Sequence, residues 1–191
     1  KRRSAAHDSM KITDEYASAS YLREAILNNN NDIRHLTTPA WCDAISEAKR
    51  IGEIADIRRL ERVILYMLRT VTPEYLAEIN DVGQGLENRI YNARMASSLD
   101  EILFTIKTKR YTMARIRRIL LSALIGIKNS DMKVPPPYAR ILAMNERGTD
   151  ILSKAKTTAK IPFDTSLARI SQKSVYAKRF SEFEIRASDI Y

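Results

Sequence analysis

The 191-residue sequence has few of the residues that build metal sites and disulfides, with one Cys and two His. A zinc site needs three or four Cys or His ligands, and Cys42, His7 and His35 are too few and too far apart to form a local cluster. A single Cys also permits no internal disulfide, which is typical of a cytoplasmic protein rather than a secreted one. The sequence therefore predicts no metal centre.

Long apolar runs and phosphate-binding loops are also lacking. The longest apolar stretch, residues 119–127, is about half of what a membrane-spanning helix requires and is interrupted by Ser122. Gly83 and Gly85 do not complete a dinucleotide fingerprint, because Asn88 stands at the third glycine position, and no Gly-Lys-Ser/Thr loop occurs. No signal peptide opens the chain, which starts at Lys1 without Met, so we expect a fragment or a trimmed chain and no membrane association.

Catalytic constellations are scarce. His7 beside Asp8 is interpreted as a surface pair, and Cys42 next to Trp41 as a small core residue. The adjacent carboxylates Asp100 and Glu101 suit the positive end of a helix dipole. We therefore assign no catalytic residue within this chain.

What the sequence does have is positive charge. Lys and Arg number 32 against 23 Asp and Glu, for a net charge of +9, while 45% hydrophobic residues indicate an ordinary globular core. Such an excess favours a polyanionic partner, with nucleic acid ahead of an acidic membrane surface.

Apolar residues recur at helical spacing over much of the chain. Thr38-Pro39 and Thr72-Pro73 each place a capping hydroxyl before a proline at the first helical position. The expected helices cover residues 21–27, 39–48, 54–71, 73–79, 86–96, 98–106 and 113–127. The predicted fold class is mainly α, a helical bundle over residues 39–127.

The pattern changes after residue 128. Three consecutive prolines, residues 135–137, indicate a stiff connector, and short apolar runs at 140–144 and 160–163 flank a helical stretch at 146–157. This order predicts a small strand-helix-strand element with parallel strands and a right-handed crossover. A last helix is expected over residues 173–191.

The densest basic segment straddles the start of the helix at 113–127. Helical geometry turns Arg115 and Arg118 away from the apolar face, and no acidic residue occurs between residues 107 and 128 to neutralise them. A solvated helix face is the simpler explanation, but we favour RNA contact because free amides and guanidinium groups meet at one helix start. The predicted RNA-binding residues are Lys107, Lys109, Arg110, Tyr111, Arg115, Arg117 and Arg118.

Several strings together resemble one family, the bacterial tRNA(Met) cytidine acetate ligases. Lys-Thr-Lys-Arg-Tyr-Thr at 107–112 and Arg-Ile-Arg-Arg-Ile-Leu at 115–120 are similar to its signature. Gly-Leu-Glu-Asn-Arg-Ile at 85–90, Pro-Tyr-Ala-Arg-Ile-Leu at 137–142 and Asn-Glu-Arg-Gly at 145–148 fit the same family in the same order.

The resemblance implies a two-part enzyme. A Rossmann-like nucleotidyltransferase domain with a Gly-His motif uses ATP, for which magnesium is a possible companion, to activate acetate as an acetyl-adenylate. A mostly helical domain holds the tRNA whose wobble cytidine is acetylated. By this resemblance, residues 1–36 are the tail end of the first domain and residues 37–191 form the second. Because the Gly-His motif is absent, we expect this chain alone to be inactive.

The same resemblance suggests nucleotide contacts near the start of the chain. Residues 17–23 are similar to an element in which hydroxyls and an arginine meet phosphate oxygens, which assigns Ser18, Ser20 and Arg23 to ATP. Arg2 matches an arginine that lies beside the nucleotide. Ser4 and Ala6 depart from the family there, because they stand where it has glycines.

Two alternatives remain open from the sequence. One is a non-catalytic basic helical adaptor that binds RNA, protein or an acidic membrane. The other keeps the fold but adenylates a different acid. The sequence indicates neither the oligomeric state nor the tRNA that is chosen.

Overall fold

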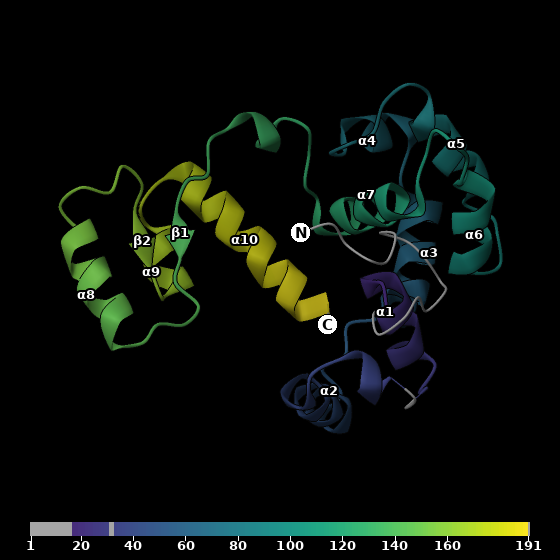
Figure 1. The fold of residues 1–191 in the computed structure, drawn as a ribbon. Helices are drawn as coiled ribbons and strands as arrows, with labels where there is room; N and C mark the ends of the chain where they lie inside the picture. Colours follow the sequence, from purple (N-terminus) through teal and green to yellow (C-terminus); the bar gives the residue numbers. More distant parts are fainter. Residues whose placement is uncertain (1–16, 31–32, 191) are drawn as a thin grey trace. The chain divides into compact units, whose positions relative to one another are not determined.

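The computed structural model describes residues 17–30 and 33–190, which are mainly helical, as predicted (Figure 1). The chain divides into two compact units, Lys1–Asp56 and Ile57–Tyr191, and each is described separately below. The predicted boundary after residue 36 concerns the domains of a longer protein and stays a prediction. No helix among the described residues is long and apolar enough to cross a membrane.

The first unit contains α1 (Ala19–Leu27), a short 3₁₀ helix (Arg34–Leu36) and α2 (Pro39–Ile51). The hydroxyl oxygen of Ser18 caps α1 by accepting the Tyr21 amide hydrogen at 3.0 Å. Thr38 caps α2 in the same way, as its sequence predicts. A small separate core holds the helices together; it contains Ala25, Ile26, Ile33 and Leu36.

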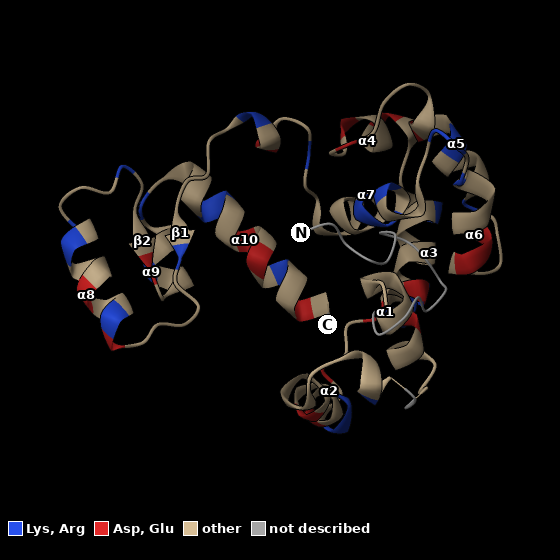
Figure 2. Ribbon diagram, in the orientation of Figure 1, with Lys and Arg blue, Asp and Glu red and all other residues tan. Residues whose placement is uncertain are grey.

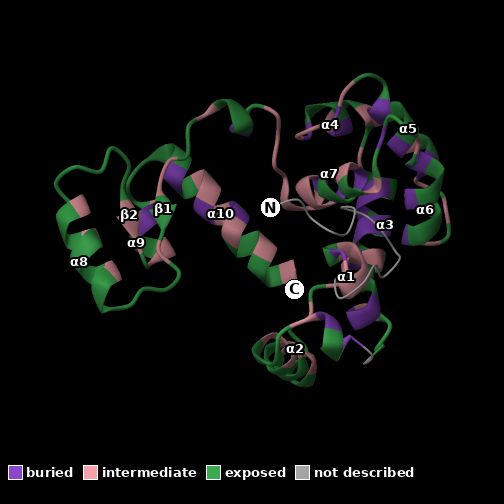
Figure 3. Ribbon diagram, in the orientation of Figure 1, coloured by how far each residue is buried: buried purple, intermediate pink, exposed green. Residues whose placement is uncertain are grey.

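The second unit begins with a 3₁₀ turn (Ile57–Leu60), followed by α3 (Glu61–Thr70), α4 (Pro73–Glu78), α5 (Leu86–Ala93), α6 (Leu99–Ile106) and α7 (Met113–Ile125). These helices share one apolar core, visible as the buried segments in Figure 3. The single helix predicted over residues 54–71 is wrong in its first part. A 3₁₀ turn places apolar residues at nearly the same spacing as an α-helix, so periodicity does not separate the two.

Local capping explains where these helices begin and end. The Ser98 hydroxyl oxygen accepts the Glu101 amide hydrogen at 3.2 Å, which confirms the helix start predicted there. The Glu101 carboxylate reaches back to Ser97, one residue earlier than in a standard capping box. Thr112 caps α7, and Gly126 ends it in a left-handed conformation with φ of +89°.

The strand-helix-strand prediction is confirmed by β1 (Ala139–Arg140), α8 (Glu146–Ala155) and β2 (Phe163–Asp164), whose two strands pair in parallel. Each strand has two residues, and both are displaced from the predicted runs. The short helix α9 (Leu167–Ser171) was not predicted, because five residues are too few to show a period. The last helix, α10 (Val175–Ile190), follows it.

Helix α10 contacts both α9 and α7. Its Arg179 donates to both carboxylate oxygens of Asp131, at 2.5 and 2.9 Å, in the 3₁₀ turn that follows α7 (Asp131–Lys133). Its Arg186 donates to the carbonyl oxygen of Ile125 at 2.9 Å. On the sheet side, Glu184 accepts the Tyr138 hydroxyl hydrogen at 2.5 Å. The C-terminal helix α10 therefore links the small sheet to the C-terminal end of α7 through these hydrogen bonds.

Candidate nucleic-acid interface

The segment between α6 and α7 is a tight turn built around Thr108. The Thr108 hydroxyl oxygen accepts the amide hydrogens of Arg110 and Tyr111, at 3.2 and 3.1 Å, and its own amide donates to the Tyr111 carbonyl at 3.2 Å. Threonine stabilises such turns because its side chain replaces a backbone acceptor. The turn places Arg110 two residues before Thr112, the cap of α7.

A second loop, residues 79–85 between α4 and α5, lies against this turn. Asp81 and Gln84 adopt left-handed backbone conformations, with φ of +70° and +61°, which are uncommon for residues other than glycine. The Asp81 amide donates to the side-chain oxygen of Asn129 at 3.3 Å. Gln84 accepts a hydrogen bond from the Arg110 guanidinium. The loop is thus fixed from both sides.

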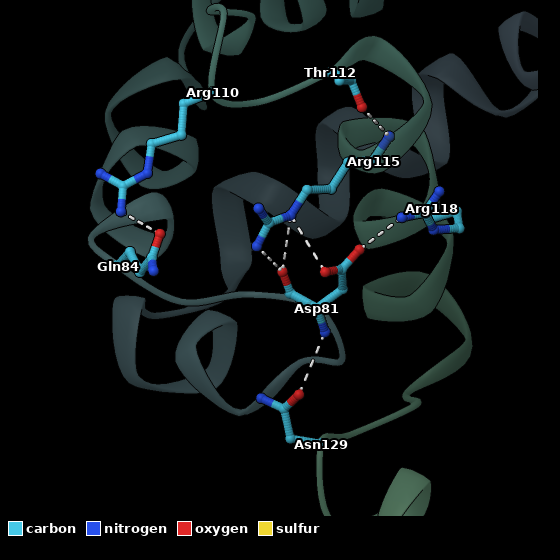
Figure 4. Close-up of polar contacts among 7 residues, drawn as sticks. All are labelled: Asp81, Gln84, Arg110, Thr112, Arg115, Arg118 and Asn129. Carbon is cyan, nitrogen blue, oxygen red and sulfur yellow. Dashed lines mark hydrogen bonds and ion pairs between the residues drawn. The ribbon is translucent and has the colours of Figure 1, made fainter.

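Asp81 is the centre of the arginine cluster shown in Figure 4. Arg115 donates to the Asp81 carbonyl oxygen through Nε and Nη2, at 3.3 and 2.8 Å, and its Nε lies 3.3 Å from carboxylate Oδ1. Arg118 donates to Oδ2 at 2.8 Å. The two guanidinium groups are therefore held at neighbouring positions by one aspartate, which leaves most of the Arg118 side chain, 65%, exposed.

Arg115 is turned away from the apolar face of α7, as predicted, but it does not extend into solvent. Its side chain is only 26% exposed, since it lies over the ring of Tyr111 as well as against Asp81. The absence of acidic residues near α7 in sequence did not mean an absence of partners, because Asp81 comes from a loop 34 residues earlier. A single carboxylate still cannot balance the surrounding cations.

Tyr111, one of the predicted RNA-binding residues, is largely buried. The residue is 7% exposed, and its hydroxyl donates to the Gln84 carbonyl oxygen at 3.1 Å, so little of the ring is accessible for stacking on a base. The guanidinium carbons of Arg110 and Arg115 lie 5.7 and 5.6 Å from the ring centre, within the range of cation–π attraction. Tyr111 therefore positions two arginines from beneath.

The other predicted cations surround this cluster. Lys107, Lys109 and Arg117 are exposed, and Figure 2 shows the basic residues of α7. The structure brings Arg110, Tyr111, Arg115 and Arg118 together through the loop at 79–85, whereas Arg117 lies on the opposite flank of the helix stripe.

Sequence reasoning missed three residues that build the site. Asp81 and Gln84 orient the arginines, yet the sequence indicated only the neighbouring glycines, as an incomplete dinucleotide fingerprint. Arg89 donates to the carbonyl oxygens of Ile106 and Thr105 at 2.9 and 2.6 Å, and so closes the C-terminal end of α6 just before the basic turn. The sequence did hold a signal for Arg89, because this residue belongs to the family-like string at 85–90.

The predicted nucleotide contacts are described only in part. Ser18, Ser20 and Arg23 lie in the first turns of α1, where the positive end of the helix dipole and a guanidinium suit phosphate oxygens. Ser18 is buried and its oxygen caps the helix, whereas Arg23 is exposed beside an apolar pocket of about 340 Å³ between α1 and α2. Arg2 lies outside the described residues. No group of three or more His, Cys, Asp or Glu side chains that could hold a metal is found in the described part of the chain.

We expect Asp81→Asn to strengthen binding of polyanions several-fold. The substitution removes the negative charge that occupies Arg115 and Arg118, while asparagine tolerates the left-handed backbone at this position. The Kd for RNA, measured at several salt concentrations, should fall and its salt dependence should steepen. Asp164→Asn, which releases the comparable exposed Arg169, is the matched control and should leave the Kd unchanged. Weaker RNA binding by Asp81→Asn would show that Asp81 assists binding instead of competing with phosphate.

Comparison with known proteins shows the class to which this chain belongs. The model of the HIGH nucleotidyl transferase family matches residues 1–191, and the chain belongs to this family. Among curated relatives, the tRNA(Met) cytidine acetate ligase of Alkaliphilus metalliredigens is 34% identical over 199 residues, and that of Thermoanaerobacter sp. strain X514 is 32% identical over 197. Both alignments cover all of this chain but only 47% and 48% of the relatives, so the chain spans about half of their length.

Solved structures share the fold. A crystal structure of apo Thermotoga maritima TmcAL superposes with a TM-score of 0.83 at 21% identity, covering 96% of this chain and 47% of that one. A second, of the same protein bound with alpha-thio ATP, superposes with a TM-score of 0.78 over 92% of this chain.

Proposed function

We propose that this chain is the C-terminal, tRNA-binding portion of a tRNA(Met) cytidine acetate ligase. In this proposal the longer protein uses ATP to activate acetate, and residues 37–191 hold the tRNA whose wobble cytidine receives the acetyl group. The names of the relatives support the reaction, and the basic face of the second unit supports the role within it.

The observation that carries the proposal is the ordered arginine cluster. Solvent-facing arginines on an ordinary helix surface would be independent of one another, but Arg110, Arg115 and Arg118 are fixed by a buried tyrosine and by the loop at 79–85. Pre-oriented guanidinium groups lose less conformational entropy when they bind phosphate oxygens. Such contacts position an RNA backbone, while base choice needs other residues.

The first turns of α1 would meet the nucleotide. Half-buried Ser20 and exposed Arg23 lie in the first turns of a nine-residue helix, and both the helix dipole and the guanidinium favour phosphate oxygens. ATP supplies the adenylyl group that activates the acid. The role of this chain there would be to bind and orient phosphate.

The longer protein tests the reaction directly. Incubated with ATP, acetate and methionine elongator tRNA, it should release AMP and yield acetylated cytidine, detected by mass spectrometry of the digested nucleosides. This chain alone should bind the tRNA and yield no acetylated cytidine. Propionate or a longer acid in place of acetate distinguishes a relative that adenylates another acid. If neither AMP nor modified cytidine forms with any acid, the proposal fails.

A further inference from the structure

Helix α3 carries a surface feature that the basic turn does not explain. Tyr66 is 71% exposed, whereas tyrosine rings are usually at least partly buried against apolar neighbours. Arg62 precedes it by four residues and Arg69 follows it by three, so the three side chains share one face of the helix. The arginines are separated by seven residues, about 10 Å along the helix axis.

This face is distinct from the one that stabilises the fold. Ile64 and Leu68, on the other side of α3, are completely buried in the core. The guanidinium of Arg69 is anchored by a hydrogen bond to the Ala96 carbonyl oxygen at 3.2 Å, which fixes its position at the surface. Arg62 is exposed, and its guanidinium makes no hydrogen bond or ion pair with the other described residues. Tyr66 is therefore presented to solvent between two cations.

An exposed aromatic ring flanked by arginines has the chemistry that binds a single RNA strand. Bases stack on tyrosine rings whatever their identity, and arginines on either side pair with the adjoining phosphates. A protein partner would favour an apolar or acid-balanced face. On α3 the one acidic side chain, Glu61, is already used to accept the Leu99 amide hydrogen at 2.9 Å.

We propose that the Arg62–Tyr66–Arg69 face of α3 is a second RNA-contact surface, on which Tyr66 stacks against an unpaired base while the two arginines bind its phosphates. The inference rests on the proposed tRNA-binding function. It supplies the aromatic contact that buried Tyr111 cannot make.

The test compares Tyr66→Leu with Tyr66→Phe in RNA binding measured across a range of salt concentrations. Loss of one stacked base should raise the Kd for tRNA about tenfold without changing the salt slope, because tyrosine carries no charge. Phenylalanine retains the ring and should keep the Kd within about twofold of the wild type. Arg62→Gln and Arg69→Gln should each lower the salt slope by about 0.7.

Two controls separate stacking from a structural effect. Tyr176→Leu, on α10, removes a tyrosine that is 53% exposed and should leave the Kd unchanged. A fully paired RNA duplex offers no free base, so Tyr66→Leu should bind it as the wild type does.

Failure of this inference differs from failure of the proposed function. If Arg115 and Arg118 variants weaken binding but Tyr66→Leu does not, only the α3 surface is wrong. If the wild-type chain binds no RNA, both are wrong. Unchanged RNA affinity together with altered self-association in sedimentation velocity would assign this face to a protein contact instead.

Discussion

Replacing both Arg115 and Arg118 with glutamine is expected to raise the Kd for tRNA at least tenfold. Each arginine can make charge-assisted hydrogen bonds to phosphate, worth roughly 1.5–3 kcal/mol. Loss of two phosphate contacts should also make the salt dependence shallower: the magnitude of the slope of log K against log salt should fall by about 1.4, on the value for single-stranded RNA. Titration of labelled tRNA at four or five salt concentrations measures both quantities.

The control for this experiment is Arg169→Gln. Arg169 and Arg118 have the same exposed fraction, 65%, and each is paired with one aspartate, but Arg169 lies on α9 beside the small sheet. Arg118→Gln alone covers the case in which loss of the partly buried Arg115 disturbs folding. An unchanged Kd and salt slope in the double variant, with intact thermal unfolding, would contradict the assignment of this face to RNA.

Replacing Asp131 with asparagine should destabilise the second unit by about 2 kcal/mol at neutral pH. The carboxylate is 7% exposed and paired with Arg179, so loss of its charge leaves a guanidinium without its partner. Buried pairs cost more than this to break, but the Arg179 side chain is 42% exposed and partly solvated. The expected loss lies between the values for surface and buried pairs.

The effect should depend on pH in a definite direction. The hydrogen bond from Arg179 holds the pKa of Asp131 below its ordinary value of 3.8. The charged form is therefore favoured in the folded protein, and its contribution to stability is present above pH 4 and lost as the pH falls through the lowered pKa. Urea unfolding at several pH values should show the wild type and Asp131→Asn converging in acid.

An exposed carboxylate provides the comparison for Asp131. Asp150→Asn on α8 should change the unfolding free energy by less than about 0.5 kcal/mol at every pH. A constant difference between the wild type and Asp131→Asn from pH 7 down to pH 3 would show that the ion pair is not the source of the stability.

The helices were predictable because their signals are local. Thr38, Thr72, Ser98 and Thr112 each cap the helix that the sequence indicated, since a cap involves residues only two or three positions apart. The strands were displaced because their bounds depend on pairing between Ala139 and Phe163, which are far apart in sequence.

For the candidate site, the sequence predicted which basic residues are present but not how they are arranged. Their arrangement depends on Asp81 and Gln84, which reach the arginines across more than 25 residues of chain. The burial of Tyr111 could not be predicted for a related reason, because the loop that packs on an aromatic ring decides how far it is buried. A basic segment predicts charge, whereas the partners that orient this charge come from tertiary structure.

The bonds made by α10 give α7 a mechanical role. Prolines 135–137 alone would leave the small sheet on a semi-rigid tether. Arg186 instead donates a hydrogen bond to the carbonyl oxygen of Ile125, the last residue of α7, while Asp81 binds arginines in the first half of that helix. The small sheet and the basic turn are thus attached to opposite ends of α7, which is about 20 Å long. A displacement at one end of this helix is therefore transmitted to the other.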